Sequence, residues 1–272
     1  MLEGKRIGFI GAGMMAEAIA RGLLKAGVGP DAITASDPDE KRRALFGEMG
    51  IRATTDNRSV AESSDILILA VKPFVMADAL ESLTNVVTPR QLVISIAAGI
   101  TTATIEQKLE AEVSVIRVMP NTPCLIGEGA IAIAPGRRAA PDQMDLAAEI
   151  FGACGVVVRV TEDKMDAVTG LSGSGPAYIY MLIEALTAGG LLVGLPRDAA
   201  LTLAAQTALG AAKMVIETGG SPAELRDKVT TPGGTTISGI AALERAGFRS
   251  ALMEAVAAAT VKSRELGRPS KS

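Results

Sequence analysis

Short apolar runs alternate with amphipathic segments through the first half of the chain. The apolar runs are rich in valine and isoleucine and lack strict alternation with polar residues, which is typical of strands buried on both faces. These expected strands are Arg6–Ile10, Ile33–Ser36, Asp65–Val71, Leu92–Ala97, Ser114–Met119, Ala130–Ala134 and Val156–Val160. The expected helices between them are Met14–Ala26, Asp39–Met49, Val75–Leu83, Thr102–Leu109 and Asp142–Phe151. This order predicts an α/β fold with a mainly parallel, doubly wound sheet.

The pattern changes near residue 160, where the strand-like runs stop and helical segments continue to the end of the chain. Glycine and proline clusters separate these segments, and Pro176, Pro196 and Pro222 stand where helices begin. The expected helices are Asp163–Leu171, Pro176–Val193, Arg197–Thr218, Ala223–Val229, Thr235–Arg245 and Phe248–Leu266. The sequence therefore predicts two domains, an α/β domain over residues 1–162 and an all-α domain over residues 163–272.

One stretch of the all-α domain is apolar enough to be weighed as a membrane span. Between Gly175 and Leu195 the only charged residue is Glu184, and the length is sufficient to cross a bilayer. The stretch contains a proline and several glycines, its flanks lack a basic cluster, and the following segment is almost as apolar but rich in alanine. We expect two such neighbouring helices to lie in a buried bundle or a tight subunit interface, with no membrane involved.

The composition narrows the classes of function. A net charge of -3 over 272 residues gives no reason to expect nucleic acid or an anionic membrane as a partner. The absence of histidine excludes Ser-His-Asp and Cys-His catalysis and the dehydrogenases in which imidazole moves the proton. Cys124 and Cys154 match no metal-site spacing, so no metal is expected, and we expect two reduced thiols in a cytoplasmic protein. The short polar N-terminus does not resemble a signal peptide.

Gly11-Ala12-Gly13-Met14-Met15-Ala16 follows the first expected strand and opens the first expected helix. The spacing G-x-G-x-x-A is that of a dinucleotide-binding turn, in which Gly11 permits the turn and Gly13 lets the backbone approach the pyrophosphate. The pyrophosphate rests on the helix N-terminus, where free N–H groups favour an anion. We therefore expect a Rossmann-type domain that binds NADH or NADPH.

Further candidate cofactor contacts stand at the carboxyl ends of the expected strands, because open parallel sheets bind ligands at that edge. They are Ile10, Ser36, Asp37, Asn57, Ala70-Val71-Lys72-Pro73 and Ala97-Ala98-Gly99. Asp37 stands where an acidic residue takes the ribose hydroxyls of NADH, whereas Arg42 and Arg43 could take the 2′-phosphate of NADPH. The preference between the two cofactors stays open at this point.

Two loops of the all-α domain are small, rich in hydroxyl groups and followed directly by apolar helices. One runs from Leu171 to Tyr178, and the other is Thr230-Thr231-Pro232-Gly233-Gly234-Thr235-Thr236. A helix N-terminus with free N–H groups is well suited to a substrate carboxylate, although helix capping with glycine turns would explain either loop singly.

With these segments taken together, the chain closely resembles the pyrroline-5-carboxylate reductases. The matching motifs occur in order along nearly the whole chain, and the segments around Ser172 and Thr236 are highly specific. The motifs are Phe9-Ile10-Gly11-Ala12-Gly13, Ala70-Val71-Lys72-Pro73, Asn121-Thr122-Pro123, the segment from Asp166 to Tyr178, Pro232-Gly233-Gly234-Thr235-Thr236-Ile237 and Gly247-Phe248-Arg249-Ser250.

The resemblance implies a Rossmann domain followed by an all-α domain that interlocks with a partner subunit, in a dimer that can assemble into larger rings. It implies reduction of Δ1-pyrroline-5-carboxylate to L-proline by hydride transfer from NADPH or NADH, the last step of proline biosynthesis. Residues 11–15, Asn57, residues 70–73 and residues 97–99 fall on family cofactor contacts. Thr235, Thr236 and Glu162 fall on family substrate contacts, with Gly234 beside the threonines, and Asp37 departs from the small polar residue of many members.

A cyclic imine can be protonated near neutral pH from solvent, so its reduction needs no histidine. We expect the Thr236 hydroxyl to contact the ring nitrogen and the N–H groups of Thr235 and Thr236 to hold the carboxylate. Two alternatives are a 3-hydroxyacid dehydrogenase, with Lys213 or Lys228 as the acid, and a non-catalytic protein that senses dinucleotides.

Overall fold

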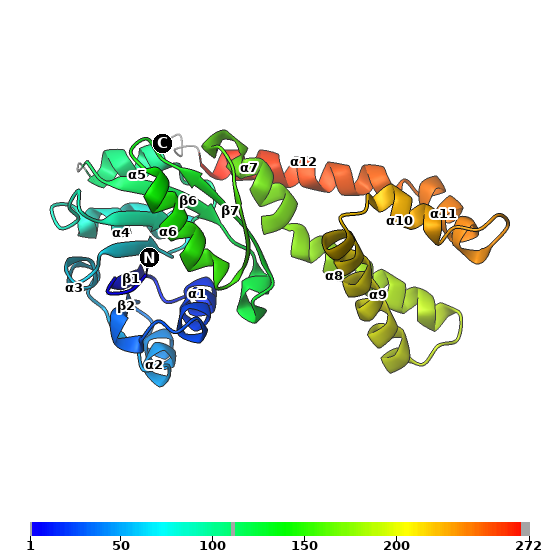
Figure 1. Cartoon of the computed structure of the whole chain (residues 1–272), viewed down its shortest axis with the longest axis horizontal. Coiled ribbons are helices and arrows are strands. Elements are labelled where there is room, and N and C mark those ends of the chain that lie inside the picture. The colour runs from blue at the N-terminus through cyan, green and yellow to red at the C-terminus, as the bar shows by residue number, and fades with distance from the viewer. Residues whose placement is uncertain (1, 110–111, 268–272) are drawn as a thin grey trace. The chain divides into compact units, whose positions relative to one another are not determined.

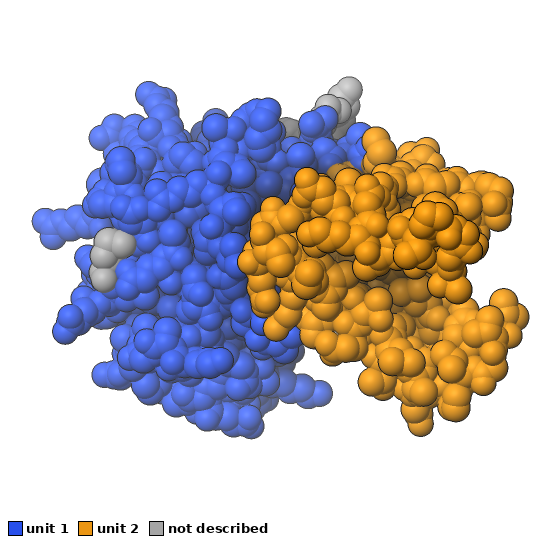
Figure 2. Space-filling view, turned by 45° about the vertical axis from the view of Figure 1, so that its right-hand side comes forward, with its two compact units in different colours: residues 1–174, 257–272 blue, residues 175–256 orange. Residues whose placement is uncertain are grey.

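The computed structural model describes residues 2–109 and 112–267, which fold into two compact units (Figures 1 and 2). Unit 1 comprises the residues up to Ser174 and those from Ala257 on, and unit 2 is Gly175–Val256. The last helix has residues in both units, and the predicted domain boundary after residue 162 stays a prediction. Met165, in the first helical segment after that boundary, buries its side chain against Ala132 and Ala134 of the sheet.

Unit 1 is built on one eight-stranded sheet with the order β3-β2-β1-β4-β5-β6-β7-β8. The strands are β1 (Ile7–Ile10), β2 (Ile33–Ser36), β3 (Arg52–Thr54), β4 (Ile66–Leu69), β5 (Leu92–Ser95), β6 (Ser114–Met119), β7 (Gly129–Pro135) and β8 (Gly155–Arg159). Every neighbouring pair is parallel except β6 and β7. The predicted mainly parallel, doubly wound sheet is therefore confirmed.

Helices cover both faces of this sheet. They are α1 (Met14–Lys25), α2 (Glu40–Glu48), α3 (Asn57–Glu62), α4 (Met76–Leu83), α5 (Thr102–Leu109) and α6 (Pro141–Gly152). Apolar side chains of α1, α2 and α6 pack into one buried cluster, and those of α3, α4 and α5 pack into a second. The sheet is thus shielded from water on both faces, as its continuous apolar strands require.

Strand β3 and helix α3 were not predicted from the pattern of apolar residues. Strand β3 has three residues at the edge of the sheet, and Arg52 at its start is exposed, so no apolar run marks it. Helix α3 has six residues and begins after Asp56, whose side chain accepts a hydrogen bond from the N–H of Arg58. Both elements are shorter than the window in which hydrophobic periodicity can be recognised.

Unit 2 is helical. After a 3-10 turn (Glu162–Lys164) and α7 (Met165–Val168), a π-helical turn (Thr169–Gly173) leads out of unit 1 into α8 (Gly175–Leu192). The other helices are α9 (Arg197–Thr218), α10 (Pro222–Lys228), α11 (Thr235–Arg245) and α12 (Phe248–Leu266). The expected helix Asp163–Leu171 is therefore divided among three kinds of helical turn.

Two helical stretches, Glu162–Leu192 and Arg197–Thr218, are long and apolar enough to cross a membrane by length and composition alone. Within the chain, 6% and 11% of their apolar windows are buried. A single chain therefore does not bury these helices in a bundle of its own, and of the two interpretations drawn from the sequence the subunit interface fits better.

Candidate functional site

The predicted cofactor residues meet at the carboxyl edge of four neighbouring strands. In the register of the sheet, Ile10 is paired with Ser36 of β2 and with Leu69 of β4, and Leu69 is paired with Ser95 of β5. The loops that follow these strands hold the glycine turn, Asp37, residues 70–73 and residues 97–99. Residues far apart in the sequence are thus brought to the edge where doubly wound sheets bind ligands.

The glycine loop after β1 fits a dinucleotide pyrophosphate. Gly11 has a φ of +96°, and a Cβ at this position would lie 2.9 Å from the carbonyl carbon and oxygen of Ala70, so the turn requires glycine. A Cβ on Gly13 would meet nothing within 4 Å, which leaves room for a ligand. Gly13 is also the N-cap of α1, and no side chain caps the helix. The N–H groups of Met14 and Met15 are therefore available to an anion.

Asp37 lies beside the glycine loop at the end of β2. Its Oδ2 atom accepts a hydrogen bond of 2.7 Å from the N–H of Ala12, and its Oδ1 atom accepts one of 2.9 Å from the N–H of Asp39. Two backbone donors therefore hold the carboxylate in one orientation. This is the position from which an acidic residue accepts hydrogen bonds from the adenosine ribose.

The two arginines after β2 are both engaged within the protein. Arg42 donates from Nε to the carbonyl of Ala12 at 2.6 Å and from Nη2 to Glu17 at 3.0 Å. Arg43 donates from Nη1 to the carbonyl of Asp37 at 2.8 Å. Arg42 thus supports the glycine loop, and Arg43 supports the turn that carries Asp37.

Glu17 is the acidic partner that holds Arg42 against α1. Burial raises the pKa of Glu17, but hydrogen bonds and the charges of Arg42 and Arg21 outweigh burial and hold this pKa below its ordinary value. The carboxylate is therefore ionised at neutral pH, and its ion pair with Arg42 joins α1 to α2.

Asn57, another predicted cofactor contact, is engaged through both polar atoms of its amide. Its Oδ1 accepts a hydrogen bond of 2.6 Å from the hydroxyl of Ser36, and its Nδ2 donates one of 3.0 Å to the hydroxyl of Ser82. Asn57 therefore joins the end of β2 to α3 and α4. Its contact with a cofactor stays a prediction.

Glu162, a predicted substrate contact, lies in the 3-10 turn after β8 and contacts the first residue of α5. Its Oε1 accepts a hydrogen bond of 2.6 Å from the N–H of Thr102, and its Oε2 accepts one of 2.7 Å from the hydroxyl of Thr102. Oε1 therefore caps α5, the helix that follows the loop Ala97-Ala98-Gly99, and Oε2 holds the side chain of Thr102. Its contact with a substrate stays a prediction.

The predicted substrate threonines lie in unit 2, in the first turn of α11. Gly234 is the N-cap of this helix, and no side chain caps it. Thr235 is exposed and Thr236 is half-buried. Within the part of the chain that the structure describes, neither threonine hydroxyl has a hydrogen-bond partner. The first turn of α11 therefore offers free N–H groups and two hydroxyls to a small acid.

A buried charged cluster surrounds Arg117 and was not predicted from the sequence. Arg117 on β6 is 4% exposed, and its Nη2 atom lies 3.2 Å from Oδ1 of Asp166. The sequence does contain a signal for this cluster, namely an arginine inside the largely apolar strand Ser114–Met119. Such an arginine requires a carboxylate partner when both faces of the sheet are covered. The partner could not be identified without the fold.

The two cysteines are buried thiols. Burial raises the pKa of Cys124, and burial together with the nearby Cys124 sulfur raises the pKa of Cys154 to about 12. Both thiols are free in the structure. Neither therefore has the lowered pKa of a nucleophilic cysteine.

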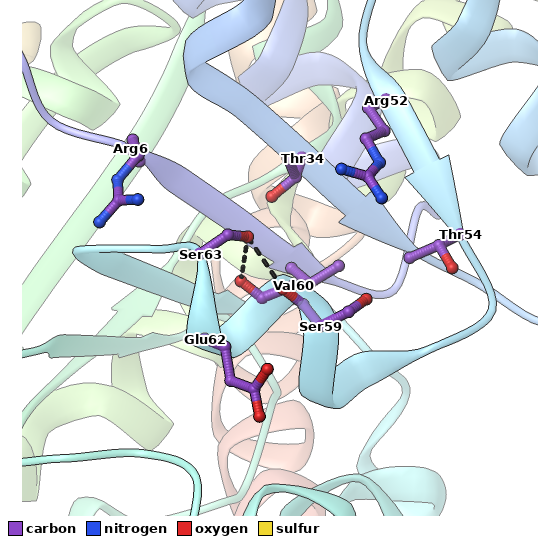
Figure 3. A pocket seen from close by; sticks show the side chains of 8 residues that line it. All are labelled: Arg6, Thr34, Arg52, Thr54, Ser59, Val60, Glu62 and Ser63. Atoms are coloured by element: carbon purple, nitrogen blue, oxygen red, sulfur yellow. Dashed lines mark hydrogen bonds between the residues drawn. The ribbon is translucent and has the colours of Figure 1, made fainter.

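A cavity of about 390 Å³ lies beside α3, and Figure 3 shows the side chains that line it. Its lining includes Arg6, Arg52 and the hydroxyls of Ser59 and Ser63. The hydroxyl of Ser63 donates to the carbonyls of Ser59 and Val60, and Arg6 pairs with Asp65. None of the predicted site residues lines this cavity.

Comparisons with known proteins match the whole chain. A pyrroline-5-carboxylate reductase of Methanosarcina acetivorans is 52% identical over 98% of this chain and 100% of its own length. The structure of a Plasmodium falciparum pyrroline carboxylate reductase with NADP bound superposes with a TM-score of 0.89 at 32% identity, covering 98% of this chain and 99% of that one. A pyrroline-5-carboxylate reductase of Coxiella burnetii gives a TM-score of 0.89 at 38% identity, covering 97% and 99%.

Two family models match separate parts of the chain. The model described as NADP oxidoreductase, coenzyme F420-dependent, matches residues 6–99, which contain the glycine loop and the other predicted cofactor residues. The model described as pyrroline-5-carboxylate reductase dimerisation matches residues 162–266, which contain all of unit 2. The helices whose apolar surfaces are uncovered in one chain thus belong to a dimerisation domain.

Proposed function

Because this chain belongs to the pyrroline-5-carboxylate reductase family, we propose that it reduces Δ1-pyrroline-5-carboxylate to L-proline with a hydride from NADPH or NADH, the last step of proline biosynthesis. The observation that carries the proposal is 52% identity over 98% of the chain. Two further observations support it, namely the uncapped N-terminus of α1 behind the glycine loop and the uncapped N-terminus of α11 at Thr235.

The residues of the chain bind and orient the reactants, and a bound nicotinamide supplies the hydride. The N–H groups of Thr235 and Thr236 hold the substrate carboxylate at the start of α11, where the helix dipole favours an anion. The Thr236 hydroxyl contacts the ring nitrogen, whose proton comes from solvent. With no histidine in the chain, a substrate that is protonated before it reacts is chemically well matched to this site.

Asp37 favours NADH over NADPH in this proposal. Its carboxylate is fixed by the N–H groups of Ala12 and Asp39 and is well placed to accept hydrogen bonds from the ribose hydroxyls. A 2′-phosphate at the same place would bring two negative charges together, and Arg42 is already paired with Glu17. Both cofactors remain usable, with NADH bound more tightly.

The active form in this proposal is a dimer or a larger ring in the cytoplasm, with no membrane or nucleic acid as a partner. Large apolar side chains of α8 and α9 are exposed in the single chain, among them Leu192, Leu209 and Ile216. A dimerisation domain places such side chains against a second copy, which removes them from water.

The test is an absorbance assay of cofactor oxidation with the five-membered imine, run with NADH and NADPH in parallel. We expect turnover with both cofactors and none when a 3-hydroxyacid is offered with NAD⁺. Thr236→Ala should lower kcat by on the order of thirtyfold or more, since loss of one well-placed polar group costs roughly 2–4 kcal/mol in the transition state. Ser238→Ala serves as the control, because Ser238 lies on the same helix and its hydroxyl donates a hydrogen bond to the main-chain carbonyl of Gly234.

Binding of NADH without its oxidation by the imine would favour the sensing protein, and an unchanged kcat in Thr236→Ala would remove this threonine from the mechanism.

A further inference from the structure

Arg117 is a buried charge that joins four segments of unit 1. It lies on β6, and an ionised side chain at this depth needs acidic partners because an unpaired buried charge is strongly unfavourable. Its Nη2 atom is 3.2 Å from Oδ1 of Asp166, and its Nη1 atom is 4.0 Å from Oε1 of Glu162. The two carboxylates lie on the segment that follows β8.

Each carboxylate also holds a second element. Asp166 accepts a hydrogen bond of 2.8 Å from the hydroxyl of Ser263, which lies near the end of α12 and is 2% exposed. Glu162 accepts hydrogen bonds from the N–H and the hydroxyl of Thr102 at the start of α5. We call Arg117, Asp166, Glu162, Ser263 and Thr102 the Arg117 cluster.

The end of α12 lies directly on the loop Ala97-Ala98-Gly99. Gly99 has a φ of +76°, and a Cβ there would lie 2.9 Å from the nitrogen of Gly267 and 3.2 Å from the carbonyl oxygen of Ser263. The loop is thus held at Gly99 by α12 and at Thr102 by Glu162. Both contacts are linked to Arg117, because α12 bonds Asp166 through Ser263, and Asp166 and Glu162 both pair with Arg117.

This loop is placed to serve the nicotinamide half of a dinucleotide. In the strand order β2-β1-β4-β5, Asp37 after β2 takes the adenosine ribose and the glycine loop after β1 takes the pyrophosphate. The other half of the cofactor then extends over β4 and β5. The loop Ala97-Ala98-Gly99 follows β5 and therefore borders the reacting ring.

The same cluster holds both helical connections between the units. Asp166 lies on α7, from which the chain enters unit 2 at Gly175, and Ser263 lies on the part of α12 that returns to unit 1 at Ala257. The hydrogen bond between Ser263 and Asp166 ties α7 and α12 together beside the sheet (Figure 1).

We propose that the Arg117 cluster is a positioning device for hydride transfer, which fixes the loop Ala97-Ala98-Gly99 together with the parts of α7 and α12 that lie in unit 1. This inference rests on the proposed reductase function. Arg117, Asp166 and Ser263 act through the loop and the helices. Glu162, for which a substrate contact is predicted separately, acts in the cluster through Thr102. Small displacements of reacting atoms lower rates steeply, so loosening the cluster slows the hydride step more than it weakens cofactor binding.

The experiment compares Ser263→Ala and Thr102→Val with the unaltered protein. Each variant removes one hydroxyl from one arm of the cluster and leaves the ion pair between Arg117 and Asp166 in place. We expect kcat to fall on the order of tenfold or more in each, and the kinetic isotope effect with deuterated NADH to rise as hydride transfer becomes rate-limiting. The Kd for NADH should change far less, because the glycine loop and Asp37 are untouched.

Conservative variants and a neighbouring control separate positioning from stability. Ser263→Thr and Thr102→Ser keep a hydroxyl and should restore most of kcat. Lys262→Ala removes an exposed ion pair one residue from Ser263 and should leave kcat and the isotope effect unchanged. Thermal unfolding curves show which variants are folded at the assay temperature.

The inference is overturned if Ser263→Ala and Thr102→Val lower the stability but leave kcat and the isotope effect unchanged. It is also overturned if neither variant folds. In both cases the cluster has a role in stability alone. An unaltered protein that does not reduce the imine contradicts the proposed function instead.

Discussion

The two units bury their apolar side chains in different ways. In unit 1 the strands β1, β4 and β5 are buried along their whole length, and helices shield both faces of the sheet. Within Gly175–Val256, all of which the structure describes, three residues are buried: Thr187, Ala200 and Ala204. Leu192 of α8 is 89% exposed. Unit 1 therefore carries its own core, whereas the helices of unit 2, which match a dimerisation domain, leave their apolar side chains uncovered in one chain.

The first prediction tests whether unit 2 depends on a partner. Leu209→Asp places a charge in the middle of α9, where the side chain is 51% exposed in one chain. Association should weaken by on the order of a hundredfold, about 3 kcal/mol, because the partner would bury an unpaired carboxylate. Sedimentation over a range of protein concentrations measures the change, and imine reduction should fall with it.

Phe74→Asp is the matched control in unit 1. Phe74 is 84% exposed, and it follows the predicted cofactor residue Pro73. We expect this variant to associate as the unaltered protein does. If both substitutions weaken association equally, the two units do not differ in this respect, because any exposed apolar residue would then contribute to association.

The second prediction tests whether the cofactor site belongs to unit 1 alone. Gly11→Ala puts a Cβ 2.9 Å from the carbonyl of Ala70 on a backbone with a φ of +96°. We expect NADH binding to be lost and the free energy of unfolding to fall by roughly 1–3 kcal/mol. Gly13→Ala is the control for strain, because its Cβ meets nothing within 4 Å. That variant should keep its stability and weaken NADH binding alone.

Fluorescence titration with NADH and denaturant unfolding measure the two effects, and the oligomeric state should stay as in the unaltered protein. A dimer that dissociates in Gly11→Ala would show that the glycine loop and the association surface are not independent.

The sheet and the linear motifs could be predicted from the sequence. Strands β2 and β6 were predicted with their observed bounds. Strands β4 and β5 were recognisable because a strand buried on both faces reads as an apolar run. The glycine loop and Asp37 were also recognisable, since each follows directly on the end of a strand. In such cases the chemistry is encoded within a few neighbouring residues.

The Arg117 cluster could not be predicted, because its members come from separate elements. Asp166 and Ser263 are 97 residues apart, and Thr102 and Glu162 are 60 residues apart. Strand β3 was missed for a different reason, since three residues at a sheet edge leave no periodic signal. The pattern of apolar residues indicates which residues are buried, but the partners of a buried residue depend on the topology of the fold.

The third prediction refines the cofactor site of unit 1. Asp37→Ser removes the carboxylate that accepts the N–H of Ala12 and leaves room for a 2′-phosphate. The ratio of kcat/KM for NADPH to that for NADH should rise about tenfold or more, equivalent to about 1.4 kcal/mol or more. Asp39→Ser, which alters only the cap of α2, is the control. An unchanged ratio would remove Asp37 from cofactor selection.

The fourth and smallest prediction concerns the ion pair that holds the cofactor loop of unit 1. The pKa of Glu17 is subject to burial, which raises it, but hydrogen bonds and charges of Arg42 and Arg21 lower it below the ordinary 4.5. A carboxyl group with a lowered folded-state pKa stabilises the fold above its unfolded-state pKa. This contribution is lost as the pH falls through the folded-state value. Glu17→Gln should therefore destabilise the protein at neutral pH and have little effect in acid.

Denaturant unfolding at about pH 7 and about pH 3 measures the difference, which we expect to be about 1 kcal/mol at the higher pH. Glu112→Gln is the control, because the Glu112 side chain is 80% exposed in its pair with Arg138 and solvent screens that attraction. If Glu17→Gln lowers the free energy of unfolding by the same amount at both pH values, the packing of the side chain and not its charge stabilises the loop. The self-contained stability of unit 1 would then come from its apolar core alone, with no contribution from the charges around the cofactor site.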